Sequence, residues 1–199
     1  DKLFTLQILA RHGFPIPKTI LAKFPVDTAI IEKQLRFPVI VKTLSGSQGS
    51  GVFLSTDKNS FDDLMQLIQA ANRSANIILQ EFVKKSRGRD LRVLTVGGRA
   101  IAAMERRATD GSFKANFSRG GKVNPYEINE ELQWLSMEIS RILQLDVAGI
   151  DFLFDEKGLK ICEVNSAPGF QGLESCCEVS IADEILKFVN IRVGRGAMR

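Results

Sequence analysis

Three side chains with oxygen atoms in the last third of the sequence could bind a metal ion. Asp151 lies in the apolar stretch 147–154, and Glu163 and Asn165 lie two residues apart in the apolar stretch 159–165. Because successive side chains of a β-strand point to opposite faces, Glu163 and Asn165 share one face. Carboxylate and amide oxygens suit Mg²⁺, whose coordination is usually completed by substrate phosphates and water. These residues therefore predict a metal site, with bound ATP as the first hypothesis and a solvated sheet edge as the alternative.

The two apolar stretches are expected to form a β-hairpin, and its register decides whether Asp151 joins the other two oxygen donors. A two- or four-residue loop would place Asp151 opposite Cys162, on the wrong face. We therefore expect a loop of three or five residues with a bulge at Gly158, which places Asp151 beside Glu163. Cys162 is then expected to point away from Glu163 and to lie in the core.

The stretch 43–51 is rich in glycine and serine and lies between two short apolar stretches. Small residues allow backbone N–H groups to converge on an anion, as in phosphate-binding loops. No Gly-Lys-Ser/Thr is present and an apolar strand follows, so neither the P-loop nor the dinucleotide-binding fingerprint fits. Lys42, at the end of the preceding strand, can hold a phosphate oxygen. We expect residues 45–50 to close over phosphates as a lid, with an ordinary β-turn as the alternative.

Composition indicates an ordinary globular protein of 199 residues, 44% apolar and 25% charged, with a net charge of +4. The sequence contains no membrane-spanning run and no signal-peptide pattern, and its three cysteines form no disulfide or zinc framework, so a cytoplasmic location is expected. The small positive charge suits triphosphate and carboxylate substrates. The basic clusters 84–89 and 105–107 contain no aromatic residue, so direct nucleic-acid binding is not expected.

Apolar periodicity predicts helices near 3–12, 29–35, 60–71, 130–143 and 181–191, with Trp134 and Met137 in the core. Strands are predicted near 38–42, 51–55, 77–79, 91–96 and 99–106, in addition to the hairpin. This pattern indicates an α+β protein. We expect residues 1–80 to form a helix and a small lobe with the lid, residues 81–191 to form a large lobe with the metal site, and residues 192–199 to be a flexible tail. The junction of the lobes is a natural place for a ligand cleft.

Motifs along nearly the whole chain occur in the order typical of one enzyme superfamily. They are Gln80-Glu81-Phe82-Val83, Asp90-Leu91-Arg92, Glu105-Arg106-Arg107-Ala108, Asn116-Phe117-Ser118-Arg119-Gly120-Gly121, Asp146-Val147-Ala148-Gly149-Ile150-Asp151 and Glu163-Val164-Asn165-Ser166-Ala167-Pro168-Gly169. In these motifs the chain resembles the ATP-grasp superfamily, and within it the RimK-type α-L-glutamate ligases. The resemblance implies an ATP-grasp fold with ATP between two α+β lobes. It also implies two Mg²⁺ or Mn²⁺ ions on Asp151, Glu163 and Asn165.

The resemblance also implies roles for individual residues on the nucleotide side. It assigns phosphate contact to Lys42, ribose contact to Asp90, further nucleotide contacts to Lys114 and Asn116, and adenine contact to Gln80, Glu81, Phe82 and Val83. Lys114 stands where the bacterial ligases carry an arginine, so the charge is kept but the bidentate fork is lost. Lys2 matches another nucleotide-side lysine, although a solvated lysine at a helix start is the alternative.

The implied activity is ATP-dependent ligation of an acid to an amino acid. A carboxylate acceptor is activated as an acyl phosphate, and glutamate then attacks it through its amine, with Arg106 and Arg119 contacting the carboxylate or acyl phosphate. The implied acceptor is the C-terminus of a ribosomal protein or a peptide, and the full-length form is expected to be a homo-oligomer. Two alternatives remain open: a ligase that acts on a free amino acid or a cofactor, and a non-catalytic nucleotide-binding fragment.

Overall fold

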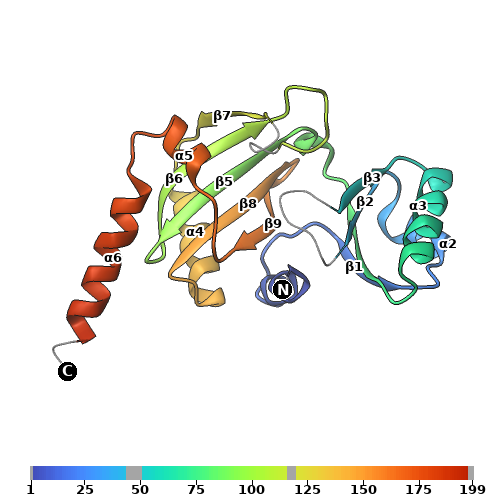
Figure 1. The fold of residues 1–199 in the computed structure, drawn as a ribbon, viewed down its shortest axis with the longest axis horizontal. Coiled ribbons are helices and arrows are strands. Elements are labelled where there is room, and N and C mark those ends of the chain that lie inside the picture. The colour runs from blue at the N-terminus through green and yellow to red at the C-terminus, as the bar shows by residue number, and fades with distance from the viewer. Residues whose placement is uncertain (1, 44–50, 116–119, 197–199) are drawn as a thin grey trace.

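A computed structural model describes residues 2–43, 51–115 and 120–196 of the chain. It is an α+β fold with two lobes, each built on an antiparallel sheet (Figure 1). The small sheet has the order β1-β4-β2-β3, from β1 (Thr19–Lys23), β2 (Val39–Thr43), β3 (Val52–Ser55) and β4 (Asn76–Glu81). The large sheet has the order β7-β6-β5-β8-β9, from β5 (Arg89–Val96), β6 (Arg99–Arg107), β7 (Lys122–Pro125), β8 (Val147–Asp155) and β9 (Gly158–Asn165).

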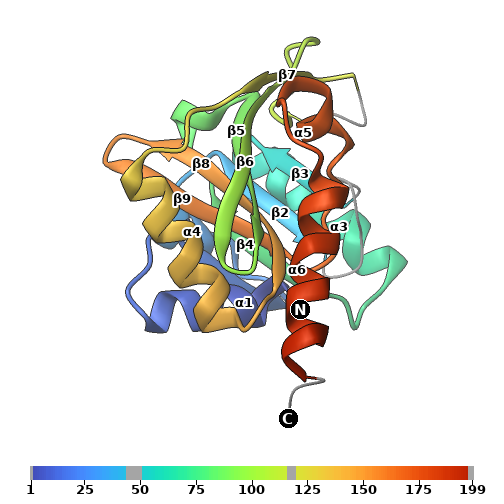
Figure 2. The same cartoon turned by 90° about the vertical axis from the view of Figure 1, so that its left-hand side faces the viewer.

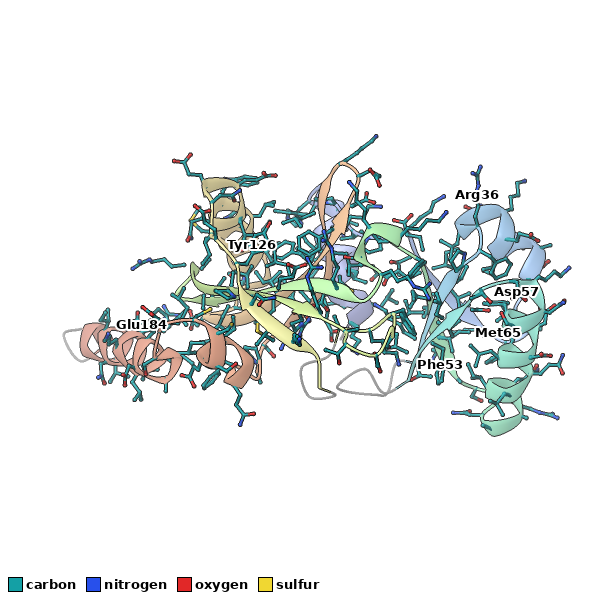
Figure 3. All side chains as sticks on the ribbon, turned by 90° about the horizontal axis from the view of Figure 1, so that it is seen from above. Arg36, Phe53, Asp57, Met65, Tyr126 and Glu184 are labelled. Carbon is teal, nitrogen blue, oxygen red and sulfur yellow. The ribbon has the colours of Figure 1, made fainter. Side chains whose placement is uncertain are left out.

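The small lobe is closed by two helices, α2 (Thr28–Leu35) and α3 (Lys58–Ala71). Their apolar faces pack on the sheet, with Phe61 of α3 buried against Val39, Val41 and Leu79. Helix α3 begins with a capping box, in which the Asp57 carboxylate accepts from the Ser60 N–H at 2.9 Å. Figure 3 shows Asp57 at the start of this helix and Met65 on it, whereas Phe53 lies on the strand side of the lobe.

The large sheet carries helices on both faces (Figure 2). One face packs against α1 (Lys2–Arg11) and α4 (Glu130–Leu143), through a core that includes Leu9, Val93 and Ile139. On the other face, Leu94 and Met104 pack under α5 (Gln171–Cys176) and α6 (Ile181–Gly196). The part of this second face nearer the small lobe carries charged side chains instead, and a short 3₁₀ turn, η1 (Lys84–Ser86), leads into it from β4.

Several expected positions differ in the structure. Helix α1 packs on the large lobe although it precedes the small lobe in the chain, because Leu9 belongs to the large core. Helix α6 continues to Gly196, beyond the expected end at residue 191, so most of the supposed tail is helical. Trp134 and Met137 are 54% and 41% exposed and not in the core, because Leu132, Ser136 and Ile139 form the face of α4 that meets the sheet.

Among the described residues, no helix is long and apolar enough to span a bilayer.

The β8–β9 hairpin closes differently from our expectation. Asp155 pairs with Gly158, which leaves the two-residue loop 156–157, so the expected odd loop with a bulge at Gly158 was wrong. Gly158 has φ +120°, a conformation that favours glycine in such a turn. An even loop alone would place Asp151 opposite Cys162, on the wrong face.

A bulge within the ladder restores the expected pairing. The register shifts between Asp151 and Phe152, so Phe152 pairs with Ile161 and Asp151 pairs with Glu163, leaving Cys162 as the extra residue. Asp151 therefore lies beside Glu163, as expected, but the bulge and not the loop produces this arrangement.

Candidate active site

A cleft of about 640 Å³ lies between the two lobes and contains the expected site residues that the structure describes. Lys42 lines it from the small lobe, and Asp151 and Glu163 line it from the large lobe. Asn116, Arg119 and the expected lid at 45–50 fall outside the described residues. The other predicted residues that line this cleft are Gln80, Glu81, Phe82, Val83, Asp90, Arg106, Lys114 and Asn165.

The end of strand β4 connects the two lobes at one end of the cleft. Gln80 is buried and donates from Nε2 to Thr19 Oγ1 at 2.9 Å, so its amide is bonded within the small sheet. The Glu81 carboxylate accepts from the Lys18 N–H at 3.0 Å and from Lys160 Nζ at 2.6 Å. Because Lys160 lies on β9, this pair bridges the lobes. Phe82 and Val83 follow directly and line the cleft.

The centre of the cleft contains Lys42 and Cys162. Lys42 Nζ lies 3.6 Å from Cys162 Sγ, so the two lobes also meet here. Our expectation that Cys162 faces the core was wrong, because the bulge breaks the strand alternation and leaves Cys162 on the cleft side with Glu163. Burial raises the pKa of the Cys162 thiol, and the nearby Lys42 charge only partly opposes this, so the thiol stays protonated at neutral pH.

Asp151, Glu163 and Asn165 form the oxygen-donor set of the cleft. Asp151 and Glu163 are direct partners across β8 and β9, and Asn165 follows Glu163 on the same face. Among the described residues no group of three His, Cys, Asp or Glu side chains could hold a metal ion, and the third predicted donor here is the Asn165 amide. Lys2 Nζ lies 3.5 Å from Glu163 Oε1, which places this lysine in the cleft and not in bulk solvent.

Two arginines and two aspartates form a charge cluster on the floor of the cleft. Arg92 donates from Nε and Nη2 to both oxygens of Asp151, each at 2.7 Å. Arg106 lies between the carboxylates, donating to Asp90 at 2.6 and 2.8 Å, with its Nη2 3.1 Å from Asp151 Oδ2. Arg106 is only 6% exposed, so it is a buried bridge and not a surface arginine. Removing one member of such a cluster leaves a buried charge uncompensated, at a cost of about 3–5 kcal/mol.

The two aspartates of the cluster differ in their pKa. Burial raises the pKa of Asp90 to about 6, although the charge of Arg106 opposes this shift. Burial also acts on Asp151, but the guanidinium groups of Arg106 and Arg92 outweigh it and hold the pKa of Asp151 below its ordinary value. Asp151 therefore stays ionised in mild acid, where Asp90 takes up a proton.

Arg92 and Lys160 are the site residues that our sequence analysis missed. A signal for Arg92 existed: Leu91 and Val93 alternate with Asp90 and Arg92, so both charged residues must share one face of a buried strand. Lys160 gave no comparable signal, since one lysine in a hairpin strand usually faces water.

Lys114 lies at the edge of the cleft, where the lobes approach each other. Its Nζ is 5.9 Å from the centre of the Phe53 ring on β3 and 5.3 Å from that of Phe113. A cation at these distances from aromatic rings is attracted weakly.

These two antiparallel lobes and the cleft between them define the ATP-grasp fold. The D-alanine–D-alanine ligase of Bacillus anthracis superposes with a TM-score of 0.75 at 16% identity, covering 98% of this chain and 69% of that chain. The ATP-grasp ligase PsnB, complexed with a minimal precursor, gives a TM-score of 0.73 at 20% identity, covering 94% and 59%.

The chain belongs to the RimK-like ATP-grasp domain family, which matches residues 1–189. It is 37% identical over 190 residues to the ribosomal protein bS6–L-glutamate ligase of Escherichia fergusonii, covering 95% of this chain and 63% of that protein. It is 38% identical over 189 residues to a probable alpha-L-glutamate ligase of Haemophilus ducreyi, covering 95% and 61%. The chain thus spans less than two thirds of the length of these curated relatives.

Proposed function

We propose that this chain forms the nucleotide-binding and catalytic region of an ATP-dependent carboxylate–amine ligase that adds glutamate to a carboxylate acceptor. The observation that carries the proposal is the pairing of Asp151 with Glu163 in a cleft that also holds Lys42 and Asn165. Membership of the RimK-like family and the names of the curated relatives support glutamate as the amine.

The cleft suggests how ATP would lie. The adenine would contact Gln80, Glu81, Phe82 and Val83 at the connection between the lobes. The ribose would lie near Asp90, and the phosphates between Lys42 and the oxygen donors, with Lys114 and Asn116 as further contacts. Because Asp90 is bonded to Arg106, ribose binding requires the hydroxyls to share or replace those hydrogen bonds.

The donor set fits a hard divalent ion, since two carboxylates and one amide share a face and Asp151 is ionised. Asp151, Glu163 and Asn165 would hold Mg²⁺ or Mn²⁺, and we propose two ions as in the resemblance above. Bound there, the ions would neutralise charge on the phosphates during transfer.

The proposed chemistry has two steps. An oxygen of the acceptor carboxylate attacks the terminal phosphorus of ATP, which forms an acyl phosphate and releases ADP. The glutamate amine then attacks the acyl carbon, forming an amide and releasing phosphate with loss of a proton from the amine. Lys42, Arg106 and Arg119 would hold the negative oxygens in place, so electrostatic positioning and not an enzyme nucleophile accounts for catalysis.

We propose a ribosomal protein C-terminus or a peptide as the acceptor, because one relative is named a ribosomal protein bS6–L-glutamate ligase. A cytoplasmic setting and a homo-oligomeric full-length form are part of the same proposal. A second candidate, a nucleotide-binding region without ligase activity of its own, is supported by the 63% coverage of the relative.

The test is ADP release and glutamate addition, followed by mass spectrometry, with ATP, Mg²⁺, glutamate and acceptor peptides. Glu163→Gln should abolish turnover and leave the fold intact, because a neutral amide keeps the shape but loses the charge. Glu156→Gln is the matched control, since Glu156 lies in the turn of the same hairpin and pairs with Lys85. Unchanged ADP release by Glu163→Gln would show that the site is wrongly assigned.

A further inference from the structure

The carboxylate of Asp151 is fully engaged by arginine. Arg92 contacts both of its oxygens at 2.7 Å, and Arg106 lies 3.1 Å from Oδ2. A divalent ion at Asp151 would therefore have to compete with at least one guanidinium group. Glu163 shows a weaker version of the same arrangement, with Lys2 at 3.5 Å.

We propose that Arg92 is an internal counter-ion, which occupies the cation position at Asp151 and exchanges with a divalent metal when the metal binds. This inference rests on the proposed function, because it concerns the same oxygen donors. It adds Arg92 to the site as a positioning residue.

Arg92, and not Arg106, is the arginine able to exchange. Arg106 is held by both oxygens of Asp90, and its side chain is 7% exposed. The side chain of Arg92 is 17% exposed, and within the described part of the chain its one hydrogen bond beyond Asp151 is long, from Nη1 to the Gly169 carbonyl at 3.4 Å. Moving Arg92 thus breaks few contacts beyond those to Asp151, and Asp151 keeps Arg106. Moving Arg106 would instead break both of its hydrogen bonds to the buried Asp90 carboxylate as well as its contact with Asp151.

The hydrogen bond from Arg92 to the Gly169 carbonyl connects the exchange to the loop that follows Asn165. Gly169 follows the oxygen donor Asn165 after three residues, and two of these, Ala167 and Pro168, line the same cleft. A single guanidinium group therefore joins the metal-site carboxylate to this loop. Once released from Asp151, Arg92 remains on the cleft face, where it can pair with an anionic oxygen of the substrates.

The test measures Mn²⁺ binding without nucleotide, from the electron paramagnetic resonance signal of free Mn²⁺, together with the Mn²⁺-dependent rise in melting temperature. Arg92→Met should bind Mn²⁺ about tenfold more tightly than the wild type, because no bidentate charged contact has to be displaced. Its melting temperature should be lower without metal and should rise more with Mn²⁺. A purely structural role would lower the melting temperature without changing the Mn²⁺ affinity.

Two variants separate partner exchange from a general effect of charge. Arg92→Lys keeps the cation but loses the bidentate fork, and it should show an intermediate gain in Mn²⁺ affinity. Arg89→Met removes a cleft arginine of the same strand, one that stacks on Phe154 at 4.1 Å, and it should leave Mn²⁺ affinity unchanged.

Each outcome decides the proposal. If Arg92→Met does not fold, a gain in affinity for Arg92→Lys still supports exchange, and wild-type affinity contradicts it. An equal gain in Arg89→Met, or no Mn²⁺ binding in any variant, also overturns it. The Mn²⁺ measurements use no ATP. If they give the expected results but the protein does not ligate, only the proposed function is refuted.

Discussion

The charge cluster on the cleft floor explains why similar carboxylates are expected to behave differently. Asp90 and Asp151 lie on neighbouring strands, yet among the described arginines two contact Asp151 and one contacts Asp90. The number of partners, set against burial, decides which carboxylate keeps its charge. Asp151 is thus suited to hold a cation, whereas Asp90 is suited to accept hydrogen bonds near neutral pH and to take up a proton in mild acid.

Asp90 predicts a specific pH dependence of stability. Burial raises its pKa from 3.8 to about 6, so the folded state binds more protons than the unfolded state between pH 4 and 6. The contribution of Asp90 to the free energy of unfolding should therefore fall as pH rises from 4 to 6 and level off above that range. Urea unfolding of the wild type and Asp90→Asn at several pH values measures this difference.

The control for this experiment is Asp183→Asn, at the exposed start of α6. Its difference from the wild type should not show the same fall between pH 4 and 6. A wild-type advantage over Asp90→Asn that grows with pH across the window would contradict the raised pKa.

The β8–β9 hairpin shows what sequence could and could not determine. Glu163 and Asn165 could be assigned to one face because strand alternation is local. The bulge at Cys162 could not be predicted from the sequence, because the register of two paired strands depends on the whole sheet and on the loop together. As a result, the pairing of Asp151 with Glu163 was predicted correctly, although the side chain of Cys162 was placed on the wrong face.

Packing between β8 and the loop after Asn165 predicts a strong effect at Gly149. A Cβ atom there would lie 2.5 Å from the Pro168 Cβ, which is too close for any real contact. Gly149→Ala should lower the free energy of unfolding by about 1–3 kcal/mol, as overpacking does in other cores.

Gly169→Ala is the matched control in the same loop, because its added Cβ would meet nothing within 4 Å. It should change stability by less than about 0.5 kcal/mol. Equal unfolding midpoints in urea for the two variants would show that the loop does not pack tightly on β8.

The pair of Glu81 and Lys160 predicts that the lobe connection influences nucleotide affinity. Carboxylates of Glu81 and Asp155 raise the pKa of Lys160 against the effect of burial, so it remains a cation that bridges the lobes. Lys160→Met should weaken binding of a non-hydrolysable ATP analogue about 3- to 10-fold, which corresponds to about 0.7–1.4 kcal/mol, the net contribution of one ordinary hydrogen bond. Calorimetric titration measures the affinity.

Lys160→Arg should restore most of this affinity, and Lys157→Met, at the exposed turn of the same hairpin, should have no effect. Unchanged affinity in Lys160→Met would mean that the ion pair does not set the relative position of the lobes.

Considered as a whole, the molecule could be assigned to its fold class and cleft from sequence, but not in all its connections. The α+β pattern and the order of the motifs were sufficient for the fold. The packing of α1 on the large lobe was not predictable from chain order, because Leu9 contacts strands that lie more than 80 residues later. Likewise, the contact between Arg92 and Asp151 could not be predicted before the pairing of β5 with β8 was known.

Relative to a full-length ligase, the 199-residue polypeptide is expected to keep most of its affinity for ATP but to show a much lower rate of ligation. The nucleotide-side groups that the structure describes, from Lys42 to Asn165, meet in one cleft, but the chain spans only 63% of a curated relative. If the additional part of such relatives helps to position the acceptor, its absence should reduce turnover far more than affinity, since a misplacement of about 1 Å can cost ~100-fold in rate. Calorimetry with an ATP analogue and a glutamate-dependent ADP assay, validated with the Escherichia fergusonii ligase, should be run on one preparation. Turnover equal to that of the relative would refute this expectation, and the absence of nucleotide binding would count against the proposed function itself.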